Sequence, residues 1–419
     1  MTGPDAFPIP APTRPPRAPH ADAWALDPDL VFLNHGSFGA CPRSVLAVQA
    51  DLRAELEANP VAFLGRALER RLDLVRARLG AFLGADPEDL AFVPNATAGV
   101  DTVLRSLRFA PGDELVTTDH EYNAALNMAR FAAARDGARV VVARIPLPTS
   151  GPDEIADRVL AAVGPRTRLV LVSHVTSPTA LVLPVERLVA TLEGRGIPVL
   201  VDGAHGPGML ALDLSDLGAS FYAGNLHKWV CAPKGAAFLH VRRDRQAATR
   251  PLAISHGAND PRPERTTFRK EFDWTGTADP TPFLAVPAAI DAVGGMVAGG
   301  WAAVTSRNAG LATIARRTLA AAAGMPVLAP EAMLGSMAAI ELPQDRDFAV
   351  RGPADPDPLQ AWLLETAAIE VPLHAWPRDP APGERRRRLL RVSAHLHNDA
   401  AEYEHLARAL RTRLAEVRR

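Results

Sequence analysis

The chain has 419 residues, of which 47% are hydrophobic and 22% charged, and its formal net charge is −1. This balance gives no basic footprint for nucleic acid or an anionic membrane, and no apolar run approaches the ~20 residues of a membrane-spanning helix. Two cysteines, Cys41 and Cys231, are too few for a disulfide framework and favour a reducing compartment. We therefore expect a cytoplasmic globular protein of about two to three domains without nucleic-acid or membrane partners.

The N-terminal segment differs in composition from the remainder of the chain. Residues 1–30 are rich in proline and lack periodicity, which predicts an N-terminal arm. From Val45 to Leu56 and from Leu64 to Phe82, apolar residues recur at helical spacing among Arg and Glu, which predicts two amphipathic helices. We expect residues 31–285 to form a large domain and residues 286–419 a smaller α+β domain.

The middle of the chain alternates short apolar runs with helical segments. The predicted strands are Leu90–Val93, Glu114–Thr117, Val140–Ala143, Leu169–Val172, Val199–Val201, Ser220–Ala223 and Ala236–Val241. Predicted helices include Gly99–Leu107, Tyr122–Ala134, Pro152–Val163, Val185–Arg195 and, beyond the strands, Pro287–Val297. Continuous apolar strands that alternate with helices favour an α/β fold with a mostly parallel seven-stranded sheet covered on both faces.

Reactive residues follow the ends of these predicted strands, where ligands gather in open parallel sheets. These groups are Asn95-Ala96-Thr97, Asp119-His120-Glu121-Tyr122, Ser173-His174-Val175-Thr176-Ser177, Asp202-Gly203-Ala204-His205 and Asn225-Leu226-His227-Lys228. A helix that begins at Ala96 and Thr97 offers free backbone N–H groups and a favourable dipole to a phosphate. Asp202 suits a protonated pyridine nitrogen, His205 a ring hydroxyl, and Tyr122 or His120 the face of an aromatic ring.

Lysine is rare in this arginine-rich chain, where it occurs only as Lys228, Lys234 and Lys270. Arginine cannot replace a lysine that must supply a neutral, nucleophilic amine, because the guanidinium group stays protonated. Lys228 follows a strand end about 25 residues after Asp202. The joint order of phosphate-type helix start, Asp202 and Lys228 predicts pyridoxal 5'-phosphate (PLP) held as an imine of Lys228.

The chain also contains the motifs of a known family in that family's order. They are Phe32-Leu33-Asn34-His35-Gly36-Ser37-Phe38-Gly39, Asn95-Ala96-Thr97, Glu121-Tyr122, Asp202-Gly203-Ala204-His205-Gly206-Pro207-Gly208 and His227-Lys228-Trp229. Over nearly its whole length the sequence resembles the class V aminotransferases among the fold-type I PLP enzymes. Within that group it is most similar to the isopenicillin N epimerase branch.

The resemblance implies roles for individual residues. Phosphate contacts are implied for Ala96, Thr97, Asn225 and His227, and Thr277 is implied to reach the phosphate of a neighbouring subunit, which predicts a homodimer. Ser177 occupies the position of a polar residue near the ring or the substrate carboxylate. Arg391 matches the arginine that grips the substrate carboxylate, and Asn34 and His35 join it as expected substrate-binding residues. The expected catalytic residues are Lys228, Asp202, Tyr122 and His205, and no metal is expected.

Several reactions remain open at this stage. The leading hypothesis is epimerisation at the α-carbon of an amino acid or its derivative, with Lys228 as the base and Tyr122, His120 or His35 as the second acid. The alternatives are a carbon–sulfur lyase similar to hercynylcysteine sulfoxide lyase, an aminotransferase and, more distantly, a non-catalytic PLP-fold binding protein. The chain has no cysteine after Cys231, which argues against a persulfide-forming desulfurase.

Overall fold

The computed structural model describes residues 15–344 and 357–417. Residues 1–14 of the predicted N-terminal arm lie outside these ranges. The arm's remaining part contains the short 3-10 helix η1 (Ala21–Ala23) and leads into β1 (Val31–Phe32). Among the described residues no single helix combines the length and hydropathy of a membrane span; only Thr281–Gly295 and Gly300–Ala323, bent by 68°, reach them as a pair.

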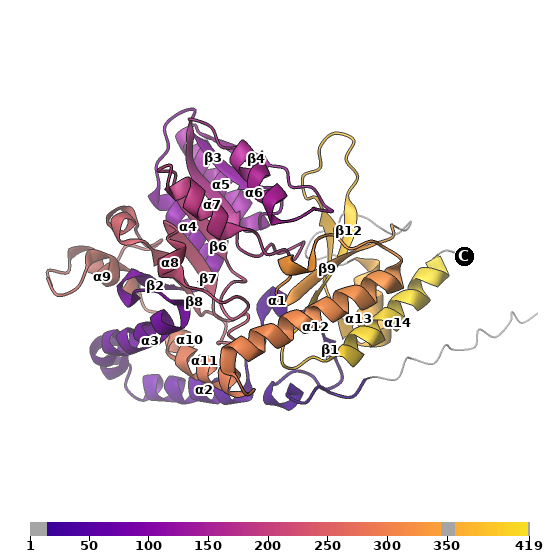
Figure 1. The fold of residues 1–419 in the computed structure, drawn as a ribbon. Helices are drawn as coiled ribbons and strands as arrows, with labels where there is room; N and C mark the ends of the chain where they lie inside the picture. Colours follow the sequence, from indigo (N-terminus) through magenta and orange to yellow (C-terminus); the bar gives the residue numbers. More distant parts are fainter. Residues whose placement is uncertain (1–14, 345–356, 418–419) are drawn as a thin grey trace, which may run out of the picture.

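A seven-stranded sheet forms the centre of the larger part of the molecule (Figure 1). Its order is β2-β8-β7-β6-β5-β3-β4, and only β8 runs against the other strands, since it pairs antiparallel with both β2 and β7. The strands are β2 (Leu90–Val93), β3 (Glu114–Thr118), β4 (Arg139–Ala143), β5 (Thr167–Ser173), β6 (Val199–Gly203), β7 (Phe221–Asn225) and β8 (Ala237–Val241). The predicted mostly parallel α/β sheet is confirmed.

Helices cover both faces of this sheet because alternate residues of each strand point to opposite faces. In β5, Leu169 and Leu171 belong to the core with α4 (Ala96–Ser106) and α5 (Asn123–Asp136). Val170 and Val172 belong instead to the core with α6 (Pro152–Ala161) and α7 (Val185–Glu193). This burial on both sides explains why β5 reads as a continuous apolar run.

The remaining helices of this part lie around the sheet. They are α1 (His35–Phe38), α2 (Arg43–Ala58), the π-helix η2 (Val61–Ala67), α3 (Leu68–Leu83), η3 (Pro87–Asp89), α8 (Leu214–Leu217), η4 (Arg243–Ala248), η5 (His256–Asn259), α9 (Thr267–Asp273), α10 (Thr281–Leu284) and α11 (Val286–Gly295). The helix predicted from Leu64 to Phe82 is therefore two elements, because its first turn is π-helical and α3 begins only at Leu68.

The C-terminal part has a separate core and a second sheet of order β11-β12-β9. Its elements are α12 (Gly300–Ala323), η6 (Glu331–Met333), β9 (Met337–Leu342), α13 (Pro358–Ala367), β10 (Ile369–Glu370), β11 (Leu373–Trp376), β12 (Arg387–Ser393) and α14 (Ala400–Val417). The long helices α12 and α14 lie side by side (Figure 1). Val31 of β1 pairs with Ile369 of β10, so the N-terminal segment packs with this C-terminal core. The domain limits at residues 30 and 285 stay predictions.

Candidate active site

A cavity of about 350 Å³ lies at the carboxyl ends of the parallel strands. Nine of the ten predicted cofactor-binding residues line it: Ala96, Thr97, Tyr122, Ser177, Asp202, His205, Asn225, His227 and Lys228. Ser37 and Phe38, from the N-terminal segment, also line it. These residues come from six separate stretches of sequence. They meet in one place because the strand ends that carry most of them share an edge of the sheet.

Lys228 lies in the loop after β7 and is half-buried where it lines the cavity. Its Nζ is 3.1 Å from His205 Nε2. Burial, and then the positive charge of Arg391, lowers the pKa of the Lys228 amine to about 7, although Asp202 opposes this shift. The structure therefore supplies a lysine with a large fraction of neutral amine near neutral pH, which is the form that attacks a carbonyl carbon.

Two buried carboxyl groups interact beside the cavity, and of these Asp202 lines it. Asp202 is the penultimate residue of β6 and pairs in register with Ser173 of β5. Its Oδ1 accepts a hydrogen bond from Ala204 N–H at 3.0 Å. Glu121 Oε1 accepts hydrogen bonds from Ser173 Oγ at 2.6 Å and Tyr122 N–H at 2.8 Å. Burial, and then the charge of Asp202, raises the pKa of Glu121 to about 8, and burial also raises the pKa of Asp202. Glu121 is thus held neutral beside Asp202.

The N-terminus of α4 lies at the edge of the cavity. Asn95 caps the helix by accepting a hydrogen bond from Ala98 N–H at 2.9 Å, and Asn225 Oδ1 accepts one from Ala96 N–H at 2.8 Å. The N–H of Thr97 has no hydrogen-bond partner among the described residues, and Thr97 lines the cavity. A free N–H at the positive end of a helix suits a phosphate group.

His227 and Thr277, the other predicted phosphate contacts, differ in their surroundings. The His227 Nδ1–H donates to Ala236 O at 3.1 Å, and burial lowers the pKa of the ring to about 4. His227 Nε2 can therefore donate to a phosphate only if the anion's charge brings a proton back to the ring. Thr277 is exposed and does not line the cavity of its own chain.

Arg391 on β12 is buried beside the cavity without an acidic partner among the described residues. Its guanidinium donates to Ser177 O at 2.8 Å, to Ser177 Oγ at 3.1 Å and to Ser37 Oγ at 2.8 Å, with a longer contact of 3.4 Å to Asn34 Oδ1. Burial lowers the pKa of Arg391 to about 10. A buried cation held only by neutral oxygens favours an anion from outside the chain, so Asn34 and Ser177 act as supports for this arginine.

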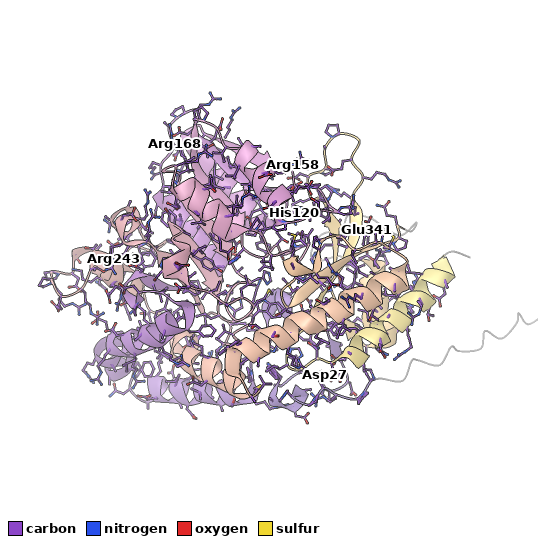
Figure 2. The ribbon with its side chains drawn as sticks, viewed as in Figure 1. Asp27, His120, Arg158, Arg168, Arg243 and Glu341 are labelled. Atoms are coloured by element: carbon purple, nitrogen blue, oxygen red, sulfur yellow. The ribbon has the colours of Figure 1, made fainter. Side chains whose placement is uncertain are left out.

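Only one of the three candidates for the second acid lines the cavity. Tyr122 does so and is 46% exposed. His120, which is labelled in Figure 2, is buried. Its ring lies against that of Trp376, and its Nδ1 is 2.7 Å from Thr179 Oγ1. His35 is fully buried and its Nε2 lies 3.0 Å from Lys228 O. The structure therefore places His35 behind the lysine loop, away from the cavity where it was expected to bind substrate.

His35, Cys231 and His395 form a buried cluster whose ligand-type atoms lie within 4.8 Å of one another. The rings of His35 and His395 are stacked, with centroids 4.4 Å apart and planes inclined by 21°. Lone pairs in two nearly parallel planes do not converge on one ion, as a tetrahedral metal site requires. Hydrogen bonds account for the cluster instead, since His395 Nε2 lies 3.3 Å from Trp229 O and His35 Nδ1 3.0 Å from His397 Nε2.

The sequence interpretation missed several residues of the site. Glu121 is part of the Glu121-Tyr122 motif but received no role from the sequence. Lys234 was named only as one of the three lysines. Lys234 lines the cavity and donates to Gly39 O at 2.9 Å. Gly39 has a φ of 69°, and a Cβ there would lie 2.0 Å from His227 O. Gly39 is therefore the sequence signal that residues 32–39 pack directly against the backbone of His227 and Lys228.

Comparisons with known proteins agree with this geometry. The sequence model of the family described as Aminotransferase class-V matches residues 33–346. Isopenicillin N epimerase of Amycolatopsis lactamdurans is 38% identical over 93% of this chain and 98% of that protein. A probable chloroplastic L-cysteine desulfhydrase of Arabidopsis thaliana is 30% identical over 92% of this chain and 83% of that protein.

Solved structures support the fold. A cysteine desulfurase from Thermococcus onnurineus NA1, described as an apo structure, superposes with a TM-score of 0.78 at 19% identity over 96% of this chain and 100% of that chain. The cystine C-S lyase C-DES in complex with cysteine persulfide superposes with a TM-score of 0.75 at 23% identity, over 91% of this chain and 97% of that chain. The predicted fold-type I architecture is confirmed.

Proposed function

Because this chain belongs to the class V aminotransferase family, whose members use PLP, we propose that it is an epimerase that inverts the α-carbon of an amino acid or amino-acid-derived substrate. Similarity to isopenicillin N epimerases over nearly the whole chain supports this reaction. The observation that carries it is the position of Tyr122, which lines the cavity together with Lys228 and lies near Arg391.

The residues present fit PLP. Asp202 is a buried carboxylate that suits a pyridine N–H, Lys228 is the amine for the aldehyde, and the free N–H of Thr97 suits the phosphate. Glu121, whose charge would interact with that of Asp202, keeps a buried Oε2 that has no hydrogen-bond partner among the described residues. When bound, PLP would supply an aldehyde for the substrate amine and an electron sink for the α-carbon once its proton is removed.

Inversion requires one group to remove a proton and another to return one to the opposite face. The neutral amine of Lys228 removes the α-proton. The Tyr122 hydroxyl delivers a proton to the other face of the same carbon, and solvent restores both groups. Tyr122 is close enough to Arg391 for a phenolate charge to raise the pKa of that guanidinium. The substrate carboxylate on Arg391 therefore brings the α-carbon within reach of both groups.

A carbon–sulfur lyase is the second candidate, favoured by the desulfhydrases at 30% and 31% identity. The same proton removal by Lys228 would then be followed by loss of a β-substituent, and transfer of the amino group to PLP would give an aminotransferase. A persulfide route through a cysteine of this chain has no support, since Cys41 and Cys231 are both buried and burial raises the pKa of Cys41 to about 12.

The experiment that tests the proposal is α-proton exchange in D2O. The L-isomers of isopenicillin N, cysteine and cystine are incubated with enzyme and PLP, and proton loss, D-isomer, pyruvate and keto acid are measured in parallel. We expect deuterium in the D-isomer. In Tyr122→Phe, inversion should fall by about 10²-fold or more while exchange in the L-isomer continues at Lys228. Pyruvate without D-isomer would replace the epimerase by the lyase, and no exchange with any substrate would contradict both.

A homodimer in which Thr277 completes the partner's phosphate site belongs to the same proposal. Thr277 is exposed, and Phe38, which lines the cavity, is 74% exposed in the single chain. A second copy would cover this apolar ring. Light scattering should give twice the mass of 44.7 kDa, and Thr277→Ala should weaken PLP binding without separating the subunits. We also propose a cytoplasmic location, which the two free thiols favour.

A further inference from the structure

His205 lies between two nitrogen groups of different character. Its Nδ1 is 3.2 Å from the indole Nε1 of Trp229, and its Nε2 is 3.1 Å from Lys228 Nζ. The rings of His205 and Trp229 are both buried, at 2% and 0% exposure. The two sides of the histidine are therefore set by fixed protein groups.

The indole fixes the position of the histidine proton. An indole N–H can only donate, so His205 Nδ1 must present its lone pair. Burial, and then the charge of Lys228, lowers the pKa of His205 far below its usual value, and the neutral ring carries a single N–H. We infer that Trp229 is a positioning residue whose indole N–H holds His205 in the tautomer with the proton on Nε2, facing Lys228 and the cofactor.

This tautomer decides which partners His205 accepts. Its Nε2–H can donate to the lone pair of a neutral Lys228 amine, whereas an ammonium group would place N–H against N–H. With PLP bound, which is the only part of the proposed function on which the inference rests, the same N–H serves an oxygen acceptor such as the ring hydroxylate. The alternative tautomer would present a lone pair to that oxygen and repel it.

Trp229 is held firmly enough for this role. Its ring lies 5.2 Å from that of His35 and 6.2 Å from that of His395 between centroids, stacked with the latter. His395 Nε2 lies 3.3 Å from the Trp229 carbonyl oxygen. A Cβ on Gly208 would lie 2.7 Å from the Trp229 carbonyl carbon, so backbone packs closely on this residue. The indole thus has little freedom to leave His205.

The test is the protonation of each ring nitrogen of His205. Long-range 15N–1H correlation spectra of holoenzyme labelled at histidine distinguish protonated from unprotonated nitrogens, and His205→Gln identifies the signal among the 12 histidines. We expect Nε2 protonated and Nδ1 unprotonated in the unaltered protein, with or without PLP. A proton on Nδ1 would overturn the inference, whatever reaction the enzyme catalyses.

Trp229→Phe removes the donor and keeps a buried aromatic ring. The ratio of the two His205 tautomers should then shift by about tenfold toward protonated Nδ1, which is what the loss of one ordinary hydrogen bond produces. Trp301→Phe is the matched control, because Trp301 Nε1 donates to Ile290 O at 2.9 Å away from the cavity. The control should leave the His205 signals unchanged. An unchanged tautomer ratio in Trp229→Phe would contradict the inference, and the spectra of the unaltered protein decide it if that variant does not fold.

Discussion

The acidic and the basic groups around the cavity differ in how the protein compensates for the burial of their charge. Burial opposes charge on both sides, raising the pKa of Glu121 to about 8 and lowering those of Lys228 to about 7 and Arg391 to about 10. On the acidic side, hydrogen bonds from Ser173 and the backbone are supplied within the chain. On the basic side, the hydrogen bonds of Arg391 within the described part of the chain all go to neutral oxygens. The acidic groups thus receive hydrogen bonds from the chain, with Glu121 Oε2 left unpaired among the described residues, whereas Arg391 has no acidic partner there.

The largest effect is expected from removing the Lys228 amine, which we propose forms the imine with PLP. Lys228→Ala should lower every activity by at least about 10³-fold and abolish the visible absorbance of the cofactor imine. Lys234→Met is the matched control, since Lys234 also lines the cavity but donates to Gly39 O. It should keep the imine absorbance. Absorbance spectra and turnover of both variants measure this, and an intact imine in Lys228→Ala would refute the assignment.

Arg391 and Arg388 offer a matched pair on β12. Arg388 is buried with a carboxylate already in place, because its Nε donates to Asp357 Oδ2 at 2.8 Å. Arg391→Lys should raise KM for a carboxylate-bearing substrate by about 10²-fold, since a lysine cannot reproduce the planar two-bond grip. Arg388→Lys should change the free energy of unfolding but leave KM unaltered. Equal effects of both changes on KM would show that Arg391 does not bind substrate.

Glu121 should make stability depend on pH in the cofactor-free protein. The folded chain keeps the Glu121 proton from about pH 4.5, where the unfolded chain releases it, up to about pH 8. The free energy of unfolding should therefore fall as the pH rises through this window. We expect Glu121→Gln to gain about 1 to 2 kcal/mol over the unaltered protein between pH 5 and pH 8, because Asp202 shares the titration.

Urea unfolding at a series of pH values measures this effect. Ser173→Ala is a useful companion, because it removes a hydrogen bond to the same carboxyl and keeps its titration. If the unfolding curves of Glu121→Gln and the unaltered protein stay parallel across pH, the buried carboxyl does not carry the proton assigned to it.

The smallest expected effect is at the helix cap of the phosphate site. Asn95→Ala should cost about 1 kcal/mol of unfolding free energy and also weaken PLP binding several-fold, because the N-terminus of α4 loses its order. Asp213→Ala removes a similar cap, the bond to Asp216 N–H at 2.9 Å in α8. That variant should lose stability alone. Calorimetry measures the loss of stability and PLP titration measures the loss of affinity. Equal PLP affinity in both variants would show that the N-terminus of α4 does not contribute to PLP binding.

The sheet and most of the cavity lining were predictable from sequence because their signals are local. Each of the seven strands is a short apolar run, and a polar group follows it at once, as Asp202 follows Val201. The parallel fold then brings those groups to one edge without further information. Lys228, Asp202 and the Thr97 helix start were found in this way.

The errors and omissions concern residues whose role depends on distant packing. His35 was expected to contact substrate, but it lies behind Lys228 through a contact across 193 residues. His120 points toward Trp376 of the C-terminal part, which no local pattern reveals. Glu121 owes its raised pKa to burial and to Asp202 on another strand. The role of each of these residues depends on its tertiary environment. Among these contacts, only the close approach at Gly39 is indicated by the sequence, through the glycine itself.

The contact between Arg391 and Asn34 joins residues 357 positions apart. A ribosome adding about 5–20 residues per second needs roughly tens of seconds to make the second partner after the first. The emerging chain therefore contains Lys228 and the N-terminus of α4 long before it contains Arg391. With the roles proposed above, the residues for PLP are all synthesised before the residue for the substrate carboxylate, so substrate recognition is the last function that the growing chain acquires.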